Sequence, residues 1–173
     1  MENLVQPLQQ QQQLLTKVDI LDSFVKVITD TRVLKKYLLN QLPALSSVTR
    51  HADLKMLIVF GGVSLQNQIM RMDIAMHQLG IEYLAGKSLR GDGLDVPKFL
   101  WKDIEQNLNA NEVILLQRLV LIVGIEVNSF RLLESLSRSI YPKTVNRLMK
   151  ANLSEALINE RSLLKTYHSY LKA

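Results

Sequence analysis

The chain of 173 residues contains no cysteine, which excludes disulfides, thiolate metal sites and cysteine nucleophiles. It has only 7 glycines and 4 prolines, so few positions interrupt the backbone and long helices are permitted. A basic segment followed by an apolar segment is also absent from the first residues, which carry Glu2 and a glutamine run. We therefore expect no signal peptide and a cytoplasmic protein.

Long apolar runs and charge of one sign are equally scarce. The longest apolar stretch, Val113 to Ile125, is interrupted by Gln117 and Arg118 and is too short for a bilayer of about 30 Å, so no membrane is expected. The net charge is +5, but the basic residues alternate with acids and form no nucleic-acid-binding motif. Phosphate loops and Ser-His pairs are lacking too. We therefore expect neither a nucleic-acid partner nor a small-molecule substrate, and no enzyme.

Helical periodicity dominates the chain after a glutamine-rich start. Residues 1–13 (MENLVQPLQQQQQ) are expected to be flexible, and residues 14–173 to form one domain. The pattern predicts helices at 14–42, 51–79, 96–108, 111–140 and 143–171. Pro43 should end the first helix, and Gly80 should cap the second. Gly61 and Gly62 inside the second helix predict close approach of a neighbouring helix.

Four long helices, two short connections and one long middle connection predict an all-α, ferritin-like four-helix bundle. The long crossover, residues 81–110, carries the short extra helix, which Asp95 and Pro97 should start. The Gly91-Asp92-Gly93 sequence within it is expected to be a turn. Asp73 and His77, four residues apart on the second helix, are expected as a solvated pair rather than as a metal site.

Three charged residues interrupt the apolar stripes: Lys35, Glu126 and Glu160. Each lies near the middle of its own helix, so antiparallel packing should bring them to one level of the bundle. A buried Glu126 would cost several kcal/mol without a partner. We therefore predict a buried polar cluster with the Lys35 ammonium between the two carboxylates. Two alternatives remain: Glu126 and Glu160 bind iron or manganese with waters, or the helices rotate so that the acids reach solvent.

Five segments carry a resemblance to a known family: LKKYLLNQLPAL (34–45), AMHQLGI (75–81), the short helix after GKSLRGDGLD (86–95), GIEVNSF (124–130) and LSEALINERSLL (153–164). In these segments the chain resembles the ferritin-like stress-response family that includes the bacterial YciE and YciF proteins. The resemblance implies a bundle that binds two metal ions. The family has a Glu where this chain has Lys35, and Glu-His-x-Glu where it has residues 123–126.

These departures lead to a specific functional prediction. We expect a non-catalytic, stress-associated or structural bundle whose degenerate metal site is replaced by the Lys35, Glu126 and Glu160 cluster. The alternative is an iron- or manganese-binding protein with a reduced carboxylate site. The third long helix is apolar over more than half its circumference, which predicts a homodimer formed through that helix.

Overall fold

The computed structural model describes residues 16–81, 95–102 and 108–172, and in the last range the side chains from residue 112. Within these ranges the chain forms five helices and no strand, which confirms the all-α prediction. They are α1 (Lys17–Val48), α2 (Ala52–Gln78), α3 (Val96–Trp101), α4 (Leu108–Ser137) and α5 (Lys143–Tyr170). Residues 1–13 and the expected turn at 91–93 lie outside the described residues.

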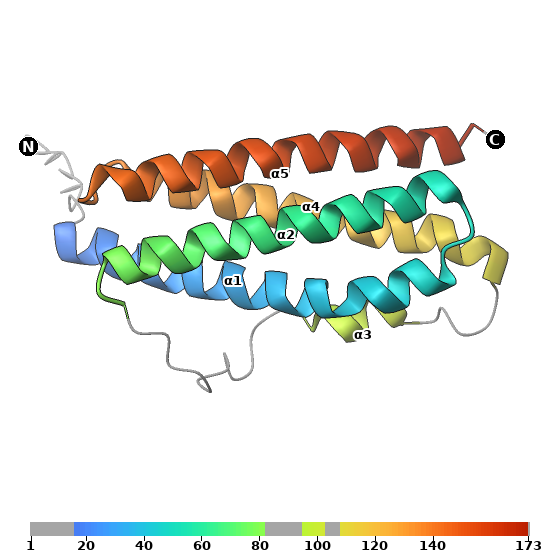
Figure 1. The fold of residues 1–173 in the computed structure, drawn as a ribbon, viewed down its shortest axis with the longest axis horizontal. Coiled ribbons are helices and arrows are strands. Elements are labelled where there is room, and N and C mark those ends of the chain that lie inside the picture. The colour runs from blue at the N-terminus through green and yellow to red at the C-terminus, as the bar shows by residue number, and fades with distance from the viewer. Residues whose placement is uncertain (1–15, 82–94, 103–107, 173) are drawn as a thin grey trace, which may run out of the picture.

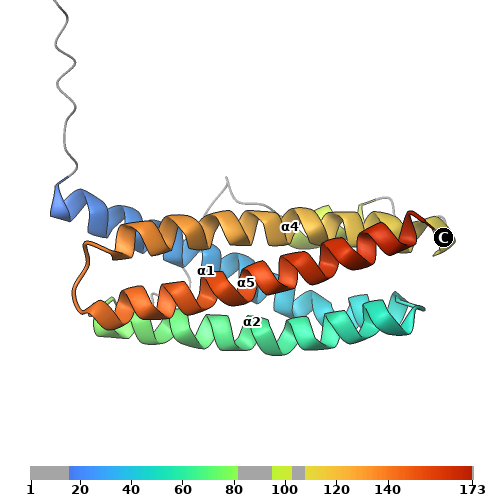
Figure 2. The ribbon, with the colours of Figure 1, turned by 90° about the horizontal axis from the view of Figure 1, so that it is seen from above.

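The four long helices form an elongated bundle (Figure 1). α1 packs against α2 and α4, and α5 packs against the same two helices. Figure 2 shows α2 and α4 on opposite sides of the bundle, with α5 crossing between them. α2 ends at one end of the bundle and α4 begins at the other, so the connection between them is a crossover (Figure 1). The short helix α3 belongs to this connection and packs against α1 and α4. This is the ferritin-like topology with a long crossover that the sequence predicts.

Side chains at the helix ends explain where the helices begin and end. The Thr16 side chain accepts from the Asp19 backbone N–H, and the Asp19 carboxylate accepts from the Thr16 backbone N–H at 2.9 Å. This reciprocal capping box starts α1 at Lys17. Asp95 caps α3 by accepting from the Lys98 N–H at 3.0 Å. Gly80 follows α2 with a φ of +66°, which confirms its predicted role as the terminating glycine.

Several predicted helix bounds are wrong. α4 was predicted at 111–140 and begins and ends three residues earlier, and two other helix ends differ by more. α1 continues through Pro43 to Val48, because a proline removes one backbone hydrogen bond while the next turn buries Leu45 completely. The short helix ends at Trp101, seven residues before the predicted end. Its position is set by tertiary contacts: Trp101 Nε1 donates to Gln41 Oε1 of α1 at 2.8 Å. The periodicity of a single segment does not predict a contact with another helix.

The glycine pair in α2 has two different environments. A Cβ atom added to Gly62 would lie 3.0 Å from Leu42 Cδ1 of α1, so this glycine does permit close approach of a neighbouring helix. A Cβ on Gly61 would meet nothing within 4 Å. The prediction of close helix approach is therefore confirmed at Gly62 and is wrong at Gly61.

The buried side chains form two apolar clusters. The Phe24 cluster consists of Phe24, Ile28, Ile69, Met72, Ala75, Met76, Val123, Val127, Phe130, Leu133, Ile140, Val145, Met149 and Ala156. The Leu115 cluster consists of Leu38, Leu45, Leu54, Ile58, Leu65, Val96, Leu100, Leu115, Leu116, Leu119 and Ile122. On α1, Lys35 stands between residues of the two clusters, and on α2 Gln68 stands between Leu65 and Ile69 in the same way. A polar layer therefore separates two apolar regions of the bundle.

Candidate functional site

The centre of the polar layer is an ion pair between α1 and α4. Lys35 Nζ lies 3.0 Å from Glu126 Oε2, and the two side chains are 0% and 3% exposed. The same ammonium donates to Gln68 Oε1 of α2 at 2.5 Å. It also lies 4.8 Å from the centre of the Phe130 ring, whose face attracts cations. Three helices thus surround one buried positive charge.

The electrostatics of this pair reflect its burial. Loss of hydration lowers the pKa of Lys35, because a buried ammonium lacks the water that stabilises its charge. The Glu126 carboxylate opposes this shift through its charge and its hydrogen bond, and the Glu155 carboxylate opposes it to a smaller extent. The second oxygen of Glu126, Oε1, is buried and has no hydrogen-bond partner among the described residues. Glu126 therefore pairs with Lys35 through one carboxylate oxygen, while its other oxygen lacks a hydrogen-bond partner among the described residues.

Amide and hydroxyl groups extend the layer from Gln68 towards α5. The Gln68 side-chain amide donates to Ser64 Oγ at 3.3 Å, and Asn159 Nδ2 of α5 donates to the same oxygen at 2.7 Å. Gln68 is fully buried, and Ser64 is 6% exposed. Buried polar groups need such partners, because an unsatisfied group costs about 1–3 kcal/mol. These bonds tie α2 to α5 at the level of the ion pair and one turn beyond it.

A second branch of the network leads from the buried layer to the surface. Asn152 Nδ2 of α5 donates to the backbone carbonyl of Gln68 at 3.3 Å. The Oδ1 atom of Asn152 accepts from Arg71 Nη1 at 3.2 Å. Arg71 also forms an ion pair with Glu155 of α5. Both of these charged side chains are about one-quarter exposed. The network therefore connects the buried ammonium to a partly solvated ion pair between α2 and α5.

Glu160 does not join the Lys35–Glu126 pair as the sequence predicts. It is half-buried, and its Oε1 lies 4.0 Å from the position of a Cβ on Gly124. No ion pair joins Glu160 to Lys35 within the part of the chain that is described. The cause is the face of α4 that Glu160 meets: it lies beside Gly124. Gly124 is two residues from Glu126 but roughly 200° around the helix, so Glu160 does not share the side of α4 that pairs with Lys35.

Sequence reasoning also missed the polar residues that α2 and α5 contribute to the layer. The apolar stripe of α2 includes Leu65 and Ile69, and Gln68, one residue from that stripe, contributes the polar group of this helix. The sequence does contain a pattern that indicates them, because α2 and α5 each place two polar residues three positions apart beside the apolar stripe. Ferritin-like metal centres draw a Glu from each of two helices and a Glu-x-x-His pair from each of the other two. The pairs with this spacing here are Gln68 with Arg71, and Asn152 with Glu155.

These residues do not fit a dimetal centre. The inward positions hold an ammonium, two amides, a guanidinium and two carboxylates, and each carboxylate pairs with a cation of the chain itself. A protonated lysine cannot ligate a metal, and its positive charge beside Glu126 opposes the binding of a metal cation there. Among the described residues, no three or more His, Cys, Asp or Glu side chains lie together in a group that could hold a metal ion.

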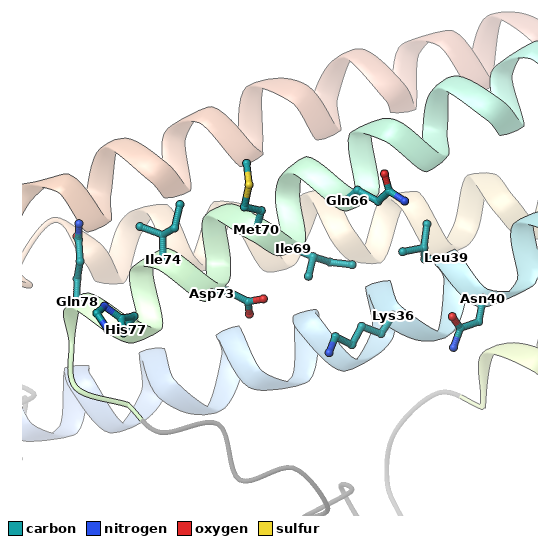
Figure 3. Close-up of a pocket in the computed structure, with 10 residues that line it drawn as sticks. All are labelled: Lys36, Leu39, Asn40, Gln66, Ile69, Met70, Asp73, Ile74, His77 and Gln78. Atoms are coloured by element: carbon teal, nitrogen blue, oxygen red, sulfur yellow. The ribbon is translucent and has the colours of Figure 1, made fainter.

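An open groove of about 770 Å³ runs outside the layer, between α1 and α2 (Figure 3). Lys36, Asp73 and His77 are among the residues that line it. Asp73 Oδ2 accepts from Arg32 Nη2 of α1 at 3.2 Å, so its carboxylate pairs across the groove rather than with His77. The expected Asp73–His77 pair is therefore replaced by a contact between α1 and α2.

By length and composition alone, the segment Glu112–Ser137 of α4 is long and apolar enough to cross a membrane. The core helices of soluble bundles share this property, and α4 packs here against α1, α3 and α5. Glu126 lies in the middle of the segment and pairs with Lys35. Packing in the bundle accounts for the buried part of the segment's apolar surface, whereas Ile114, Leu121, Ile125 and Leu132 are 36–53% exposed.

Comparison with known proteins adds one result to this geometry. No protein-family model matches the chain, and no curated protein matches its sequence. Among solved structures, the E. coli stress protein YciF matches over 88% of this chain and 97% of its own, with a TM-score of 0.71 and 17% sequence identity. The chain has the YciF fold. This match confirms the resemblance to the YciE and YciF proteins at the level of fold.

Proposed function

We propose that the chain is a non-catalytic, ferritin-like bundle of the YciE/YciF type, in which the Lys35–Glu126 pair replaces a metal centre. Its role is stress-associated or structural, and it acts in the cytoplasm. The observation that carries the proposal is the 3.0 Å contact between a fully buried ammonium and a buried carboxylate at the middle of the bundle. The YciF fold supports the association with stress, because that neighbour is described as a stress protein.

The physical basis of the proposal is charge balance. A dimetal centre holds buried carboxylates together by placing cations between them, and removal of the metal leaves the carboxylates without partners. In this chain the Lys35 ammonium supplies one positive charge to Glu126, and the Arg71 guanidinium supplies another to Glu155. Both cations belong to the protein. The bundle can therefore keep its polar layer whether or not metal is present.

Elemental analysis of the purified protein tests the proposal directly. We expect no stoichiometric iron or manganese in the wild-type protein. Stoichiometric metal that is lost in a folded Glu126→Ala variant would contradict the proposal. It would support the alternative function instead, an iron- or manganese-binding protein with a reduced carboxylate site. The buried Glu126 Oε1, which has no partner among the described residues, is the observation that favours this alternative.

A charge reversal gives a sharper version of the test. Lys35→Glu places a second carboxylate beside Glu126 in the buried layer, so we expect a large loss of thermal stability that added Mn²⁺ partly restores. The wild-type melting temperature should not respond to Mn²⁺. Lys36→Glu, the same charge change on the neighbouring residue, is the matched control and should show no Mn²⁺ response. Equal Mn²⁺ responses in the wild type and the Lys35→Glu variant would contradict the proposal.

A further inference from the structure

One face of α5 carries exposed basic side chains and no acid. At about 100° per residue, six exposed residues fall within a sector of roughly 60°, and together they form the α5 basic stripe: Lys143, Arg147, Lys150, Arg161, Lys165 and His168. The two acids of α5, Glu155 and Glu160, lie about 80° outside opposite edges of this sector. Charges of both signs are mixed along the sequence, but they are separated around the helix.

The α5 basic stripe lies on the side of α5 that faces away from the bundle. Other sides of α5 make its contacts: Asn146 donates to the Glu134 carbonyl of α4 at 3.1 Å, and Asn152 donates to the Gln68 carbonyl of α2 at 3.3 Å. Figure 2 views the bundle from the outward side, with α5 in front of the other helices. The whole stripe is therefore open to a partner.

The cations of the stripe are not neutralised by the bundle. None of them forms an ion pair with another residue in the part of the chain that the structure describes. Lys143 Nζ donates to the Arg138 carbonyl at 3.0 Å, a contact that leaves its charge unopposed. The Glu134 carboxylate of α4 is already paired with the Arg138 guanidinium at 2.9 Å. The positive charge of the stripe is therefore available at the surface.

The stripe also accounts for the net charge of the whole chain. Five of the 21 lysines and arginines lie in it, and the 16 that remain equal the 16 acidic residues in number. The net charge of +5 is thus concentrated on one helix face, where it attracts a partner of opposite charge. The expectation of no nucleic-acid partner rests on the mixing of charges along the sequence, which folding removes on α5. We propose that the α5 basic stripe binds duplex DNA through its phosphate backbone, without sequence preference.

The dimensions of the stripe suit a long, straight polyanion. Lys143 and Lys165 are 22 residues apart on one helix, which is about 33 Å along its axis. This length is close to one turn of duplex DNA, about 34 Å. Duplex DNA carries one negative charge per about 1.7 Å of its axis, so roughly 20 phosphates lie along the length of the stripe. A stiff duplex and a straight helix can therefore meet over several phosphates at once.

The side chains of α5 favour duplex DNA over two other polyanionic partners. Proteins that bind single strands stack bases on aromatic side chains, and the stripe contains no Phe, Tyr or Trp. Helices that bind membranes insert a row of large apolar side chains. α5 exposes one such side chain, Ile158, whereas Val145 and Met149 are fully buried in the bundle. Binding through charge alone matches a phosphate backbone.

Paired charge reversals test the stripe. Lys150→Glu with Arg161→Glu removes two of its cations, and Lys26→Glu with Lys55→Glu makes the same change in net charge at exposed positions of α1 and α2. We expect the wild type to bind a labelled duplex of about 30 base pairs in fluorescence anisotropy, and the stripe variant to bind roughly tenfold or more weakly. The control variant should bind within about threefold of the wild type. Absence of binding by the wild type, or equal losses in two variants with wild-type melting temperatures, would overturn the proposal.

The salt dependence of binding tests the phosphate contacts independently. With about five contacts, affinity should fall several hundredfold between about 50 and 200 mM salt, and the slope should be smaller by about two in the stripe variant. Duplexes of unrelated sequence should compete equally well. A slope that is unchanged in the stripe variant would refute the proposal. Tighter binding to single-stranded DNA, to duplex RNA or to anionic phospholipid vesicles than to duplex DNA would refute it as well.

Discussion

The two apolar clusters and the polar layer between them hold the same helices together by different means. In the Phe24 and Leu115 clusters, aliphatic and aromatic side chains fill the space between helices, and each contact is weak and non-directional. In the layer, a few directional bonds connect Lys35, Gln68 and Glu126 of three different helices. An apolar side chain can pack against a different apolar neighbour, whereas a buried charge needs its particular partner.

This difference indicates what the polar layer contributes to the fold. A buried ion pair adds little net stability compared with apolar residues of the same volume, because both charges lose their hydration. It does penalise every arrangement that separates the two charges. A slip of α1 by one turn would move Lys35 about 5 Å from Glu126 and bury both charges unpaired. The clusters thus supply most of the stability, and the layer fixes the register of the helices.

Removal of the buried cation is expected to change the free energy of unfolding more than the removal of any other single charge. Lys35→Met leaves the Glu126 carboxylate buried without its ammonium partner, and we expect a loss of about 3–5 kcal/mol in the free energy of unfolding. The double variant Lys35→Met with Glu126→Leu removes both charges and should be far more stable than the single variant. Its remaining loss comes mainly from the buried Gln68 Oε1, which no longer has a donor, about 1–3 kcal/mol. Urea unfolding of both variants measures these values.

The comparison between the two Lys35 variants is the decisive part of this experiment. If the single and double variants lose the same free energy, the layer behaves like the apolar clusters and Glu126 does not depend on Lys35. The same result would arise if Glu126 took up a proton readily when its partner is removed. Measuring the single variant at several pH values separates these cases, because a protonated Glu126 makes its unfolding free energy depend on pH.

A comparable effect, with a lower minimum, is expected from each single substitution in the two apolar clusters. Ile28→Ala and Leu116→Ala each remove a fully buried side chain, one from each cluster, and should each cost about 2–5 kcal/mol. These residues lie on opposite sides of the polar layer, well over 10 Å apart, so the losses should add within about 0.5 kcal/mol in the double variant. Marked non-additivity would show that the clusters are energetically coupled through the layer.

The sequence predicted most of the fold because helical periodicity and local capping signals are properties of single segments. The Gly80 cap and the α3 start at Asp95 with Pro97 all appear where expected. The wrong helix ends involve contacts between segments. α1 passes Pro43 because Leu45 is buried by other helices, and α3 ends where Trp101 contacts α1. Such contacts depend on the assembled bundle.

The polar layer was predicted in part for a similar reason. Heptad spacing places Lys35 and Glu126 on the inward faces of their helices, and the structure joins them. Spacing alone does not give the rotation and height of one helix relative to another, so it grouped Glu160 with Lys35, whereas Glu160 lies beside Gly124. It also overlooked Gln68 and Asn152, since neutral amides beside an apolar stripe resemble solvated residues. An i,i+3 search for polar pairs on each helix would have found both.

The smallest effect tests how tightly the helices pack beside the Leu115 cluster. Gly61→Ala should raise the free energy of unfolding by about 1 kcal/mol, because alanine favours the helix and nothing lies within 4 Å of the new Cβ. Gly62→Ala should gain less, because its Cβ would lie 3.0 Å from Leu42 Cδ1 and that side chain must shift. Thermal unfolding at one protein concentration compares the two variants. Equal gains would show that the α1–α2 contact yields easily, and that the apolar region is less tightly constrained than the polar layer it adjoins.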